Sequence, residues 1–279
     1  MSTSMENKSI EIRRINDDNG QYIFEFRKLL QGDNLLKHLK CDDAYLYRFL
    51  AAVDYDITNA FQRIKNFYEL LSENPKWFSM GGLIDKRRLI QKDISIILNK
   101  HDKEGRPIYL LKLDKINPFT MDFVKDLVIL QDLCCEGIFI NNMDISMKGL
   151  CIIVDVANIP LNVIKWATPH IIKTSIKRIY SMPIKDFRYH IVNTTTFLNI
   201  IMQLVWPFLP QHIKEQIKFH LFDYKSLHQH IDKDSLPKEY GGTQKINTTE
   251  LRRTLLDCEN KIAHNFQVNR RLFLDAITN

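Results

Sequence analysis

The sequence Gly149-Leu-Cys-Ile-Ile-Val-Asp-Val156 is apolar at nearly every position and includes one aspartate near its end. A second apolar run, Tyr189-His-Ile-Val-Asn193, follows a stretch that opens at Thr168-Pro169 and has helical character. A strand whose side chains are apolar on both faces is covered on both faces, which is typical of a parallel sheet. Strands separated by helices indicate an α/β crossover architecture.

Further segments on either side extend this pattern. Pro107-Ile-Tyr-Leu-Leu-Lys-Leu113 predicts the first strand, because a proline at the start of a strand removes no ladder hydrogen bond. Residues 219–222 predict another strand, whereas residues 85–99 and 120–139 have the apolar spacing of helices. The sequence therefore predicts an α/β domain in the middle of the chain.

Both ends of the chain are predicted to be helical. Apolar residues recur at helical spacing over 22–30, 43–53 and 57–71, and Asp56 is the expected N-cap of the third helix. No polar residues converge on these helices, so we expect a packed helical subdomain. A weaker repeat over 249–277 predicts a final helix. The resulting division is a helical subdomain over 1–82, an α/β domain over 83–245 and a helical tail over 246–279.

Composition restricts the class of protein. The formal net charge of +6 favours anionic surfaces but does not require nucleic acid, and we expect no nucleic-acid partner. The first residues contain no apolar core of a secretory signal. The five cysteines form no CxxC or zinc spacing, and we expect reduced thiols in a cytosolic protein, with Cys134 and Cys135 in ordinary helix packing.

Motifs of several enzyme classes are absent from the sequence. No GxGxxG, GxxxxGK[ST] or GxSxG occurs, which argues against dinucleotide, P-loop and α/β-hydrolase sites. His228 and His230 have no third ligand at a suitable spacing, so no metal is expected. Asp114 and Asp155 lie near strand ends without a complementary partner, which favours structural hydrogen bonding. We therefore expect no enzymatic activity, no cofactor and no catalytic residue.

The helix predicted over 197–209 is apolar over most of its circumference. Its apolar arc spans roughly 200°, about twice the stripe of an ordinary surface helix. Pro207 removes an internal hydrogen bond and makes the far end easy to bend. Such a helix suits a lid that covers a lipid-like ligand with one face and contacts a membrane with the other. The alternative is a central core helix.

Motifs in a fixed order resemble the CRAL-TRIO lipid-binding family, to which α-tocopherol transfer protein and cellular retinaldehyde-binding protein belong. The matching segments are spread over about 200 residues: Asp43-Ala-Tyr-Leu-Tyr-Arg-Phe-Leu50, Asp102-Lys-Glu-Gly-Arg-Pro-Ile-Tyr109, Gly149 to Asp155, Tyr189 to Asn193, Pro207-Phe-Leu209 with Ile213-Lys-Glu215, and Leu236-Pro-Lys-Glu-Tyr-Gly-Gly242. The resemblance implies a mixed, mostly parallel sheet flanked by helices that enclose a hydrophobic cavity. It also implies a mobile gate helix at 197–209.

The resemblance and the alternation of the central strand together give a set of candidate cavity residues. Leu150, Ile152 and Val154 share one face of that strand, and Cys151, Ile153 and Asp155 share the other. Tyr189, Asn193 and Thr195 are the candidate polar groups. The candidate ligand-binding residues are Ile129, Leu133, Leu150, Ile152, Val154, Ile159, Ile179, Ile184, Tyr189, Ile191, Phe197, Ile200, Ile201, Leu204 and Phe208.

A second set of residues is expected to contact membrane headgroups. These residues are Lys185, Arg188, Met202, Trp206, His212, Lys214 and Lys218. Relatives often carry further arginines where Ala51 and Val53 stand here, and basic residues where His212 and Gln216 stand. We therefore expect a generic contact with anionic membranes rather than a specific phosphoinositide site.

The leading hypothesis is a soluble cytoplasmic carrier, peripheral at membranes, that moves a hydrophobic ligand between them. Its ligand would be a tocopherol, retinoid, carotenoid or similar lipid-like molecule, and its second partner a transient anionic membrane surface. One alternative is a phosphoinositide-sensing trafficking adaptor with the same fold. Another is an enzyme acting on an isoprenoid or lipid, which needs an acid/base pair in the cavity.

Overall fold

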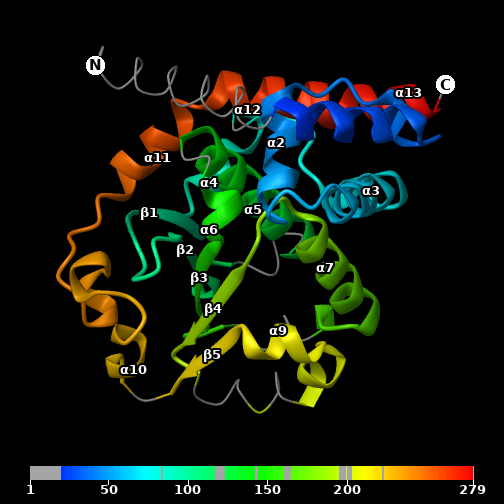
Figure 1. Cartoon of the computed structure of the whole chain (residues 1–279). Helices are drawn as coiled ribbons and strands as arrows, with labels where there is room; N and C mark the ends of the chain where they lie inside the picture. The colour runs from blue at the N-terminus through cyan, green and yellow to red at the C-terminus, as the bar shows by residue number, and fades with distance from the viewer. Residues whose placement is uncertain are drawn as a thin grey trace.

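The computed structural model describes residues 20–82, 84–116, 123–141, 144–159, 165–194, 199, 203–221 and 223–278. A sheet at the centre of these residues has helices on both sides (Figure 1). Its strands are β1 (Ser95–His101), β2 (Pro107–Lys112), β3 (Leu150–Asp155), β4 (Phe187–Val192) and β5 (Ile217–His220). The α-helices are α2 (Asp43–Ala51), α3 (Ile57–Glu73), α4 (Arg87–Ile90), α5 (Phe123–Asn141), α6 (Ile145–Lys148), α7 (Pro169–Ser181), α9 (Gln211–Glu215), α10 (Lys225–His228), α11 (Thr248–Leu256), α12 (Glu259–Phe266) and α13 (Leu272–Thr278).

The strands lie side by side in the order of the chain. β1 pairs with β2 antiparallel, and β2, β3, β4 and β5 continue as parallel neighbours. Ile153 lies opposite Leu110 of β2 and His190 of β4. The crossovers between parallel strands contain α5 and α7, as the βαβ pattern requires. The predicted mixed, mostly parallel sheet is confirmed.

β1 corrects one prediction, because residues 85–99 do not form a single helix. Only Arg87–Ile90 is α-helical, and Asp93 has a positive φ of 52° before the strand begins. Ile94, Ile96 and Leu98 are buried, with half-buried residues between them. A period of two is that of a strand, and the isoleucines are β-branched. The helical reading came from the accidental spacing of Ile90, Ile94 and Ile97.

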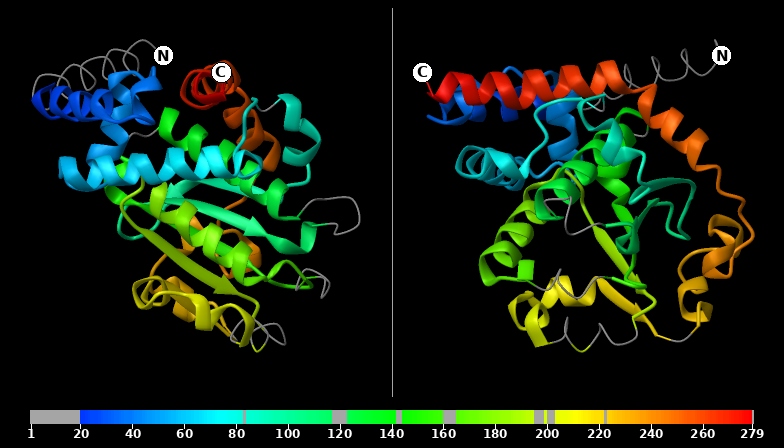
Figure 2. Two further views of the ribbon diagram at one scale, coloured as in Figure 1. Left: turned by 90° about the vertical axis from the view of Figure 1, so that its right-hand side faces the viewer. Right: turned by 180° about the vertical axis from the view of Figure 1, so that it is seen from behind.

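The two faces of the sheet are covered by different parts of the chain. Figure 2 shows α7 on one side and the orange segment that carries α10 on the other. The α5 face is the side of the sheet that is covered by α5 and α7. Its side chains include Tyr109, Ile152, Val154 and Tyr189. The α10 face is the opposite side, which packs against Leu227, Ile231, Leu236 and Tyr240. Its sheet side chains include Ile108, Leu110, Cys151, Ile153 and Val192.

The C-terminal tail returns to the N-terminal helices. Phe273 of α13 shares a core with Phe26, Phe49 and Tyr68, and the Tyr68 hydroxyl donates to the Asn269 carbonyl over 2.7 Å. Figure 1 shows α13 alongside the blue helix over residues 20–32. The tail is not one regular helix, because a π-helical turn over Gln267–Arg271 separates α12 from α13. The domain boundaries at 82 and 245 stay a prediction.

Two predicted helix starts are confirmed. The Asp56 side chain accepts a hydrogen bond from the Asn59 amide at the start of α3, and the Thr168 hydroxyl accepts one from the Ile171 amide at the start of α7. Both side chains satisfy amides that have no partner inside the helix. The start of α7 matters for function because this helix forms part of a cavity.

Candidate functional site

A cavity of about 230 Å³ lies between the α5 face of the sheet and the helices α5 and α7. Its sheet residues are Tyr109, Leu111, Ile152, Val154 and Tyr189. Its helix residues are Val124, Leu127, Val128, Gln131, Ile171 and Ser175. The alternation of β3 directs Ile152 and Val154 to one side of the sheet. On α5, the lining residues follow the i, i+3, i+4, i+7 spacing of one helix face.

α5 is apolar around most of its circumference because it packs in two directions. One face lines the cavity, while Ile129, Leu130 and Leu133 are buried in the core shared with the sheet and α12. Periodicity alone could not select the cavity face, since a helix buried on all sides has no single apolar stripe. The candidates Ile129 and Leu133 lie in this core, next to the residues that line the cavity.

The cavity contains few polar groups. The Tyr109 hydroxyl is 2.7 Å from the Ser95 hydroxyl, and Gln131 Oε1 accepts a hydrogen bond from Arg178 Nη1 over 2.7 Å. The hydroxyls of Ser175 and Tyr189 have no hydrogen-bond partner within the part of the chain that the structure describes. Burial raises the pKa of Tyr189, so its phenol is neutral. The walls thus offer a ligand apolar surface and, besides the paired Tyr109, three polar side chains, those of Gln131, Ser175 and Tyr189.

A buried ion cluster lies next to Gln131. Asp132 accepts hydrogen bonds from the Ser79 amide at 2.8 Å, from Arg270 at 2.6 Å and from Arg178. One turn further along α5, Glu136 pairs with Arg48 at 2.9 Å and accepts from Asn265 at 2.6 Å. The cluster joins α2, α5, α7 and the tail. The prediction that the N-terminal helices carry no converging polar group is therefore wrong, because Arg48 belongs to α2.

Asp155 at the end of β3 has the structural role that we predicted. Its carboxylate accepts hydrogen bonds from the Ala157 amide, the Asn193 side chain and the Tyr240 hydroxyl, at 2.7 to 2.9 Å. Asn193 also accepts from Tyr224 over 2.8 Å, so the oxygen and the nitrogen of its amide both have protein partners. This arrangement holds the segment around Tyr240 against the ends of two strands.

The candidate ligand-binding residues fall into five groups. Those that line the cavity are Ile152, Val154 and Tyr189. Those buried in the adjoining core are Ile129, Leu133, Leu150 and Ile184, and those half-buried against it are Ile159, Ile179 and Ile191. Leu204 and Phe208 are exposed, and Thr195, Phe197, Ile200 and Ile201 lie outside the described residues. Ligand contact by these residues stays a prediction.

The gate segment is described only in part. Trp206–Phe208 forms a 3-10 turn, in which Trp206 packs on Phe219 with ring centroids 5.7 Å apart. Lys214 Nζ lies 5.6 Å from the centre of the Trp206 ring, while Leu204 and Phe208 are about two-fifths exposed. Met202 lies outside the described residues. Among the helices that are described, none has both the length and the apolarity to cross a bilayer.

The candidate headgroup residues do not form one cluster. Lys185 pairs with Asp54 at 2.6 Å, and Arg188 pairs with Asp186 at 3.0 Å. The His212 ring lies 4.9 Å from Tyr180, on the side of the sheet that carries α7. Lys218 instead contacts His230 at 3.2 Å, beside the α10 face. Lys214 and Lys218 therefore lie on opposite sides of the sheet.

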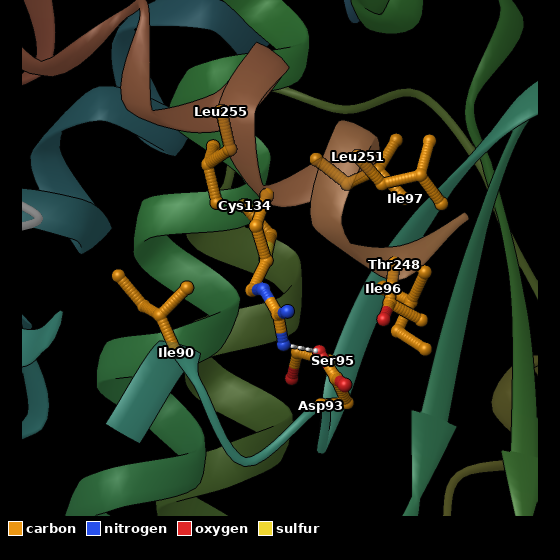
Figure 3. Close-up of a pocket in the computed structure, with 10 residues that line it drawn as sticks. Ile90, Asp93, Ser95, Ile96, Ile97, Cys134, Thr248, Leu251 and Leu255 are labelled. Carbon is orange, nitrogen blue, oxygen red and sulfur yellow. Dashed lines mark hydrogen bonds and ion pairs between the residues drawn. The ribbon is translucent and has the colours of Figure 1, made fainter. Parts of the chain in front are cut away.

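A second pocket is far smaller. It holds about 20 Å³, close to the space of one water molecule, and is enclosed by β1, α4, α5 and α11 (Figure 3). Arg252 of α11 pairs with Asp93 across it at 2.7 Å. Leu251 and Leu255 point into it from the same helix. This pocket marks where the tail packs over the edge strand and has no room for a ligand.

The cysteine thiols are buried and protonated. All five cysteines are free and buried, and burial raises the pKa of the Cys41 thiol to about 11 and that of Cys135 to about 12. Such thiols are protonated at neutral pH and chemically inert. Within the described ranges, no group of histidine, cysteine, aspartate and glutamate side chains is arranged to hold a metal ion.

Comparisons with known proteins agree with this geometry. Clavesin-1 of Xenopus laevis is 25% identical over 243 residues, which cover 86% of this chain and 73% of the relative. Alpha-tocopherol transfer protein-like of Mus musculus is 26% identical over 227 residues, which cover 81% of this chain and 66% of the relative. The crystal structure of Sfh5 superimposes with a TM-score of 0.50 at 13% identity, covering 89% of this chain and 98% of that one.

The Sfh5 likeness concerns the fold alone. The family model adds a match that follows the motifs in the sequence. It is described as the CRAL/TRIO domain and matches residues 91–242, from the turn before β1 to the glycine pair that follows Tyr240. Proteins of this family bind hydrophobic, lipid-like ligands. The sheet, the helices that cover it and the match over more than half of the chain show that this protein belongs to the CRAL/TRIO domain family.

Proposed function

We propose that this protein binds a hydrophobic small molecule or lipid in the cavity between the sheet and the helices α5 and α7, and transfers it between membranes. The observation that carries the proposal is the largely apolar cavity of about 230 Å³ in a CRAL/TRIO domain. Burial of about 400 Å² of ligand surface gains about 10 kcal/mol before ordering costs, at roughly 25 cal/mol per Å². This gain is relative to water, so it would keep the ligand bound while the carrier crosses the aqueous space between two membranes.

The size and the walls of the cavity define the ligand class. Its volume is slightly below the range of about 300 to 1,000 Å³ of ordinary small-molecule sites. A compact ligand, or one part of a longer tocopherol-, retinoid- or carotenoid-like molecule, fits this space. Gln131, Ser175 and Tyr189 are the polar groups that would orient it. These side chains form no acid/base pair, which supports carriage rather than catalysis.

Exchange of the ligand would take place at an anionic membrane surface. Exposed Leu204 and Phe208 supply apolar contact, and Lys214 lies over the ring of Trp206, which is between them in the sequence. The protein would act as a cytoplasmic carrier that is peripheral at membranes. A phosphoinositide-sensing adaptor is the weaker reading, because Lys185 and Arg188 are already paired with acidic residues and Lys218 lies on the other side of the sheet.

Filling the cavity tests the carrier function. Val154→Trp places a large side chain in the cavity, and the extra volume costs about 1 to 3 kcal/mol, so the fold should survive. Ile84→Trp is the control, because Ile84 is 68% exposed and lies outside the cavity wall. We expect Val154→Trp to lose the co-purifying lipid seen by mass spectrometry and to slow lipid transfer between liposomes about tenfold or more. Native occupancy and transfer in a folded Val154→Trp protein would refute the proposal.

A further inference from the structure

Gln131 connects the cavity to the buried ion cluster, and the chemistry of its neighbour determines its orientation. Arg178 Nη1 lies 2.7 Å from Gln131 Oε1. A guanidinium group only donates hydrogen bonds, so the side-chain atom that faces Arg178 must be the oxygen. The amide nitrogen is therefore on the other side of the carboxamide group, away from Arg178.

The amide nitrogen of Gln131 is free to bind a ligand. It has no protein partner within the described ranges of the chain, and Gln131 belongs to the cavity wall. Its two N–H groups are donors without an acceptor. Among the other wall residues, Leu127, Val128 and Ile171 are apolar, and no hydrogen bond joins the hydroxyls of Ser175 and Tyr189 to this amide. A ligand that presents an acceptor oxygen at this point would satisfy the amide.

The ion cluster strengthens this preference. Arg48, Arg178 and Arg270 face two carboxylates, Asp132 and Glu136, which leaves one excess positive charge within these ion pairs. Charges act over longer distances in a protein interior than in water. The Gln131 carboxamide lies in this field with its carbonyl toward Arg178, so its positive end is directed away from the cluster. The field favours an acceptor oxygen and opposes an ammonium group.

We propose that the cavity selects ligands bearing a carbonyl oxygen, which accepts a hydrogen bond from the Gln131 amide, and that Arg178 positions this amide. The inference rests on the proposed carrier function and adds the chemical class of the cargo. An aldehyde, ketone or ester with an apolar body satisfies the site. A hydrocarbon leaves the amide unpaired, and an amine meets two donors and a positive field.

Three probes of one skeleton test the selection: acetylnaphthalene, ethylnaphthalene and naphthylethylamine. Their affinities are measured by quenching of naphthalene fluorescence with wild type, Gln131→Leu and Gln131→Glu. We expect Gln131→Leu to weaken the ketone about fivefold, the effect of one neutral hydrogen bond, and to leave the hydrocarbon unchanged or tighter. Gln131→Glu should weaken the ketone and strengthen the amine. Leu111→Met is the control, because it alters an apolar part of the wall and should change ketone and hydrocarbon affinities together.

The outcomes separate this inference from the carrier function. If the protein binds the hydrocarbon and both Gln131 variants bind the ketone as well as wild type does, the carbonyl selection is overturned and the carrier function stands. If wild type binds none of the probes and retains no co-purifying lipid, the carrier function and the selection fail together. If wild type binds none of the probes but retains a lipid that lacks a carbonyl group, the selection alone is overturned. If wild type retains a lipid with a carbonyl group and Gln131→Leu loses it, the selection is supported. Gln131→Glu keeps a polar side chain beside Arg178, so it decides the matter if Gln131→Leu does not fold.

Discussion

Ile152 and Ile153 are neighbours in β3 and are almost equally buried, yet they face different environments. Ile152 lines the cavity on the α5 face, whereas Ile153 is fully enclosed on the α10 face with Leu227, Ile231 and Leu236. The helices α5 and α7 leave a space above the sheet, whereas the segment around α10 packs Leu227, Ile231 and Leu236 directly against Ile153. One strand thus serves binding on one side and stability on the other.

The polar groups of the two faces differ in the same way. On the α10 face, His190 Nδ1 lies 2.9 Å from His220 Nε2, and His220 Nδ1 lies 2.7 Å from the Ser226 hydroxyl. Asp155 has three partners on the same side. On the α5 face, Ser175, Tyr189 and the amide nitrogen of Gln131 have no partner within the described ranges. Polar groups that are hydrogen-bonded within the protein stabilise the fold, and polar groups without a protein partner are available to a ligand.

The largest expected effect comes from the ion cluster behind the cavity. Asp132→Asn removes the charge that both Arg178 and Arg270 face, and loss of one partner of a buried pair costs about 3 to 5 kcal/mol. Asp43→Asn is the control, because its pair with Arg27 is exposed and is worth roughly 0 to 1 kcal/mol. Unfolding in guanidinium chloride measures both. Equal losses in the two variants would show that the cluster contributes no more than a surface pair.

A matched pair of truncations tests the two faces directly. Ile153→Ala should lower the free energy of unfolding by about 4 kcal/mol, because it opens a cavity in a filled core. Ile152→Ala should cost only about 2 kcal/mol, since its side chain already borders empty space. Urea unfolding of both variants provides the comparison. A larger loss for Ile152→Ala would reverse our assignment of the faces.

Acid should weaken the α10 face. Burial first, and then neighbouring positive charge, lowers the pKa of His190 to about 3 and that of His220 to about 4. The unfolded chain takes up these protons near pH 6.5 while the folded protein resists them. Stability is therefore present above pH 6.5 and falls as the pH drops toward these lower values, by roughly 1 kcal/mol per pH unit and histidine.

Replacement of one histidine tests this pH dependence. His220→Gln should reduce the loss of unfolding free energy between pH 7 and pH 5 by roughly 1 kcal/mol or more. Exposed His101 provides the control variant His101→Gln, which should follow wild type. Urea unfolding at each pH gives the values. A pH dependence that His220→Gln leaves unaltered would place the acid sensitivity elsewhere.

The smallest expected effect concerns membranes and again separates the two sides of the sheet. Lys214→Gln should weaken binding to phosphatidylserine liposomes about fivefold, because one basic residue near the surface contributes about 1 kcal/mol. Lys218→Gln should leave binding unchanged, since Lys218 contacts His230 beside the α10 face. Co-sedimentation at rising salt should show screening of the attraction. Equal weakening by both substitutions would contradict a one-sided contact.

Liposomes of matched surface charge test the specificity of this contact. We expect phosphatidylserine to bind nearly as well as phosphoinositides, because the candidate basic residues are dispersed and two of them are paired with carboxylates. A strong preference for one phosphoinositide would instead favour the trafficking adaptor.

Much of the fold could be predicted from local patterns. β3 was predicted from a short apolar run, α3 from its regular spacing and its Asp56 cap, and α7 from Thr168-Pro169. These signals depend on nearby residues, so they survive without tertiary context. β1 was missed because its isoleucines satisfy a helical spacing as well as an alternating one, and only the antiparallel pairing with β2 selects the strand.

The candidate site was harder to predict. Ile152 and Val154 follow from the alternation of the central strand and Tyr189 is a candidate polar group, but the sequence does not predict Gln131 and Ser175. The available signal for Gln131 was its place beside Asp132 within the apolar run Leu127-Val-Ile-Leu-Gln-Asp-Leu133. Its meaning depends on Arg178, which is 47 residues further along the chain. No local pattern reports such a pair.

By itself the sequence determined the α/β class, the CRAL/TRIO family and the alternation of the central strand, because these depend on residue order and short spacing. The tertiary structure decided which face of α5 lines the cavity, which basic residues lie on the same side and how Arg48, Arg178 and Arg270 meet two carboxylates. Those features arise when distant segments pack. A buried charge or amide acquires its role only from partners that folding brings within hydrogen-bond distance.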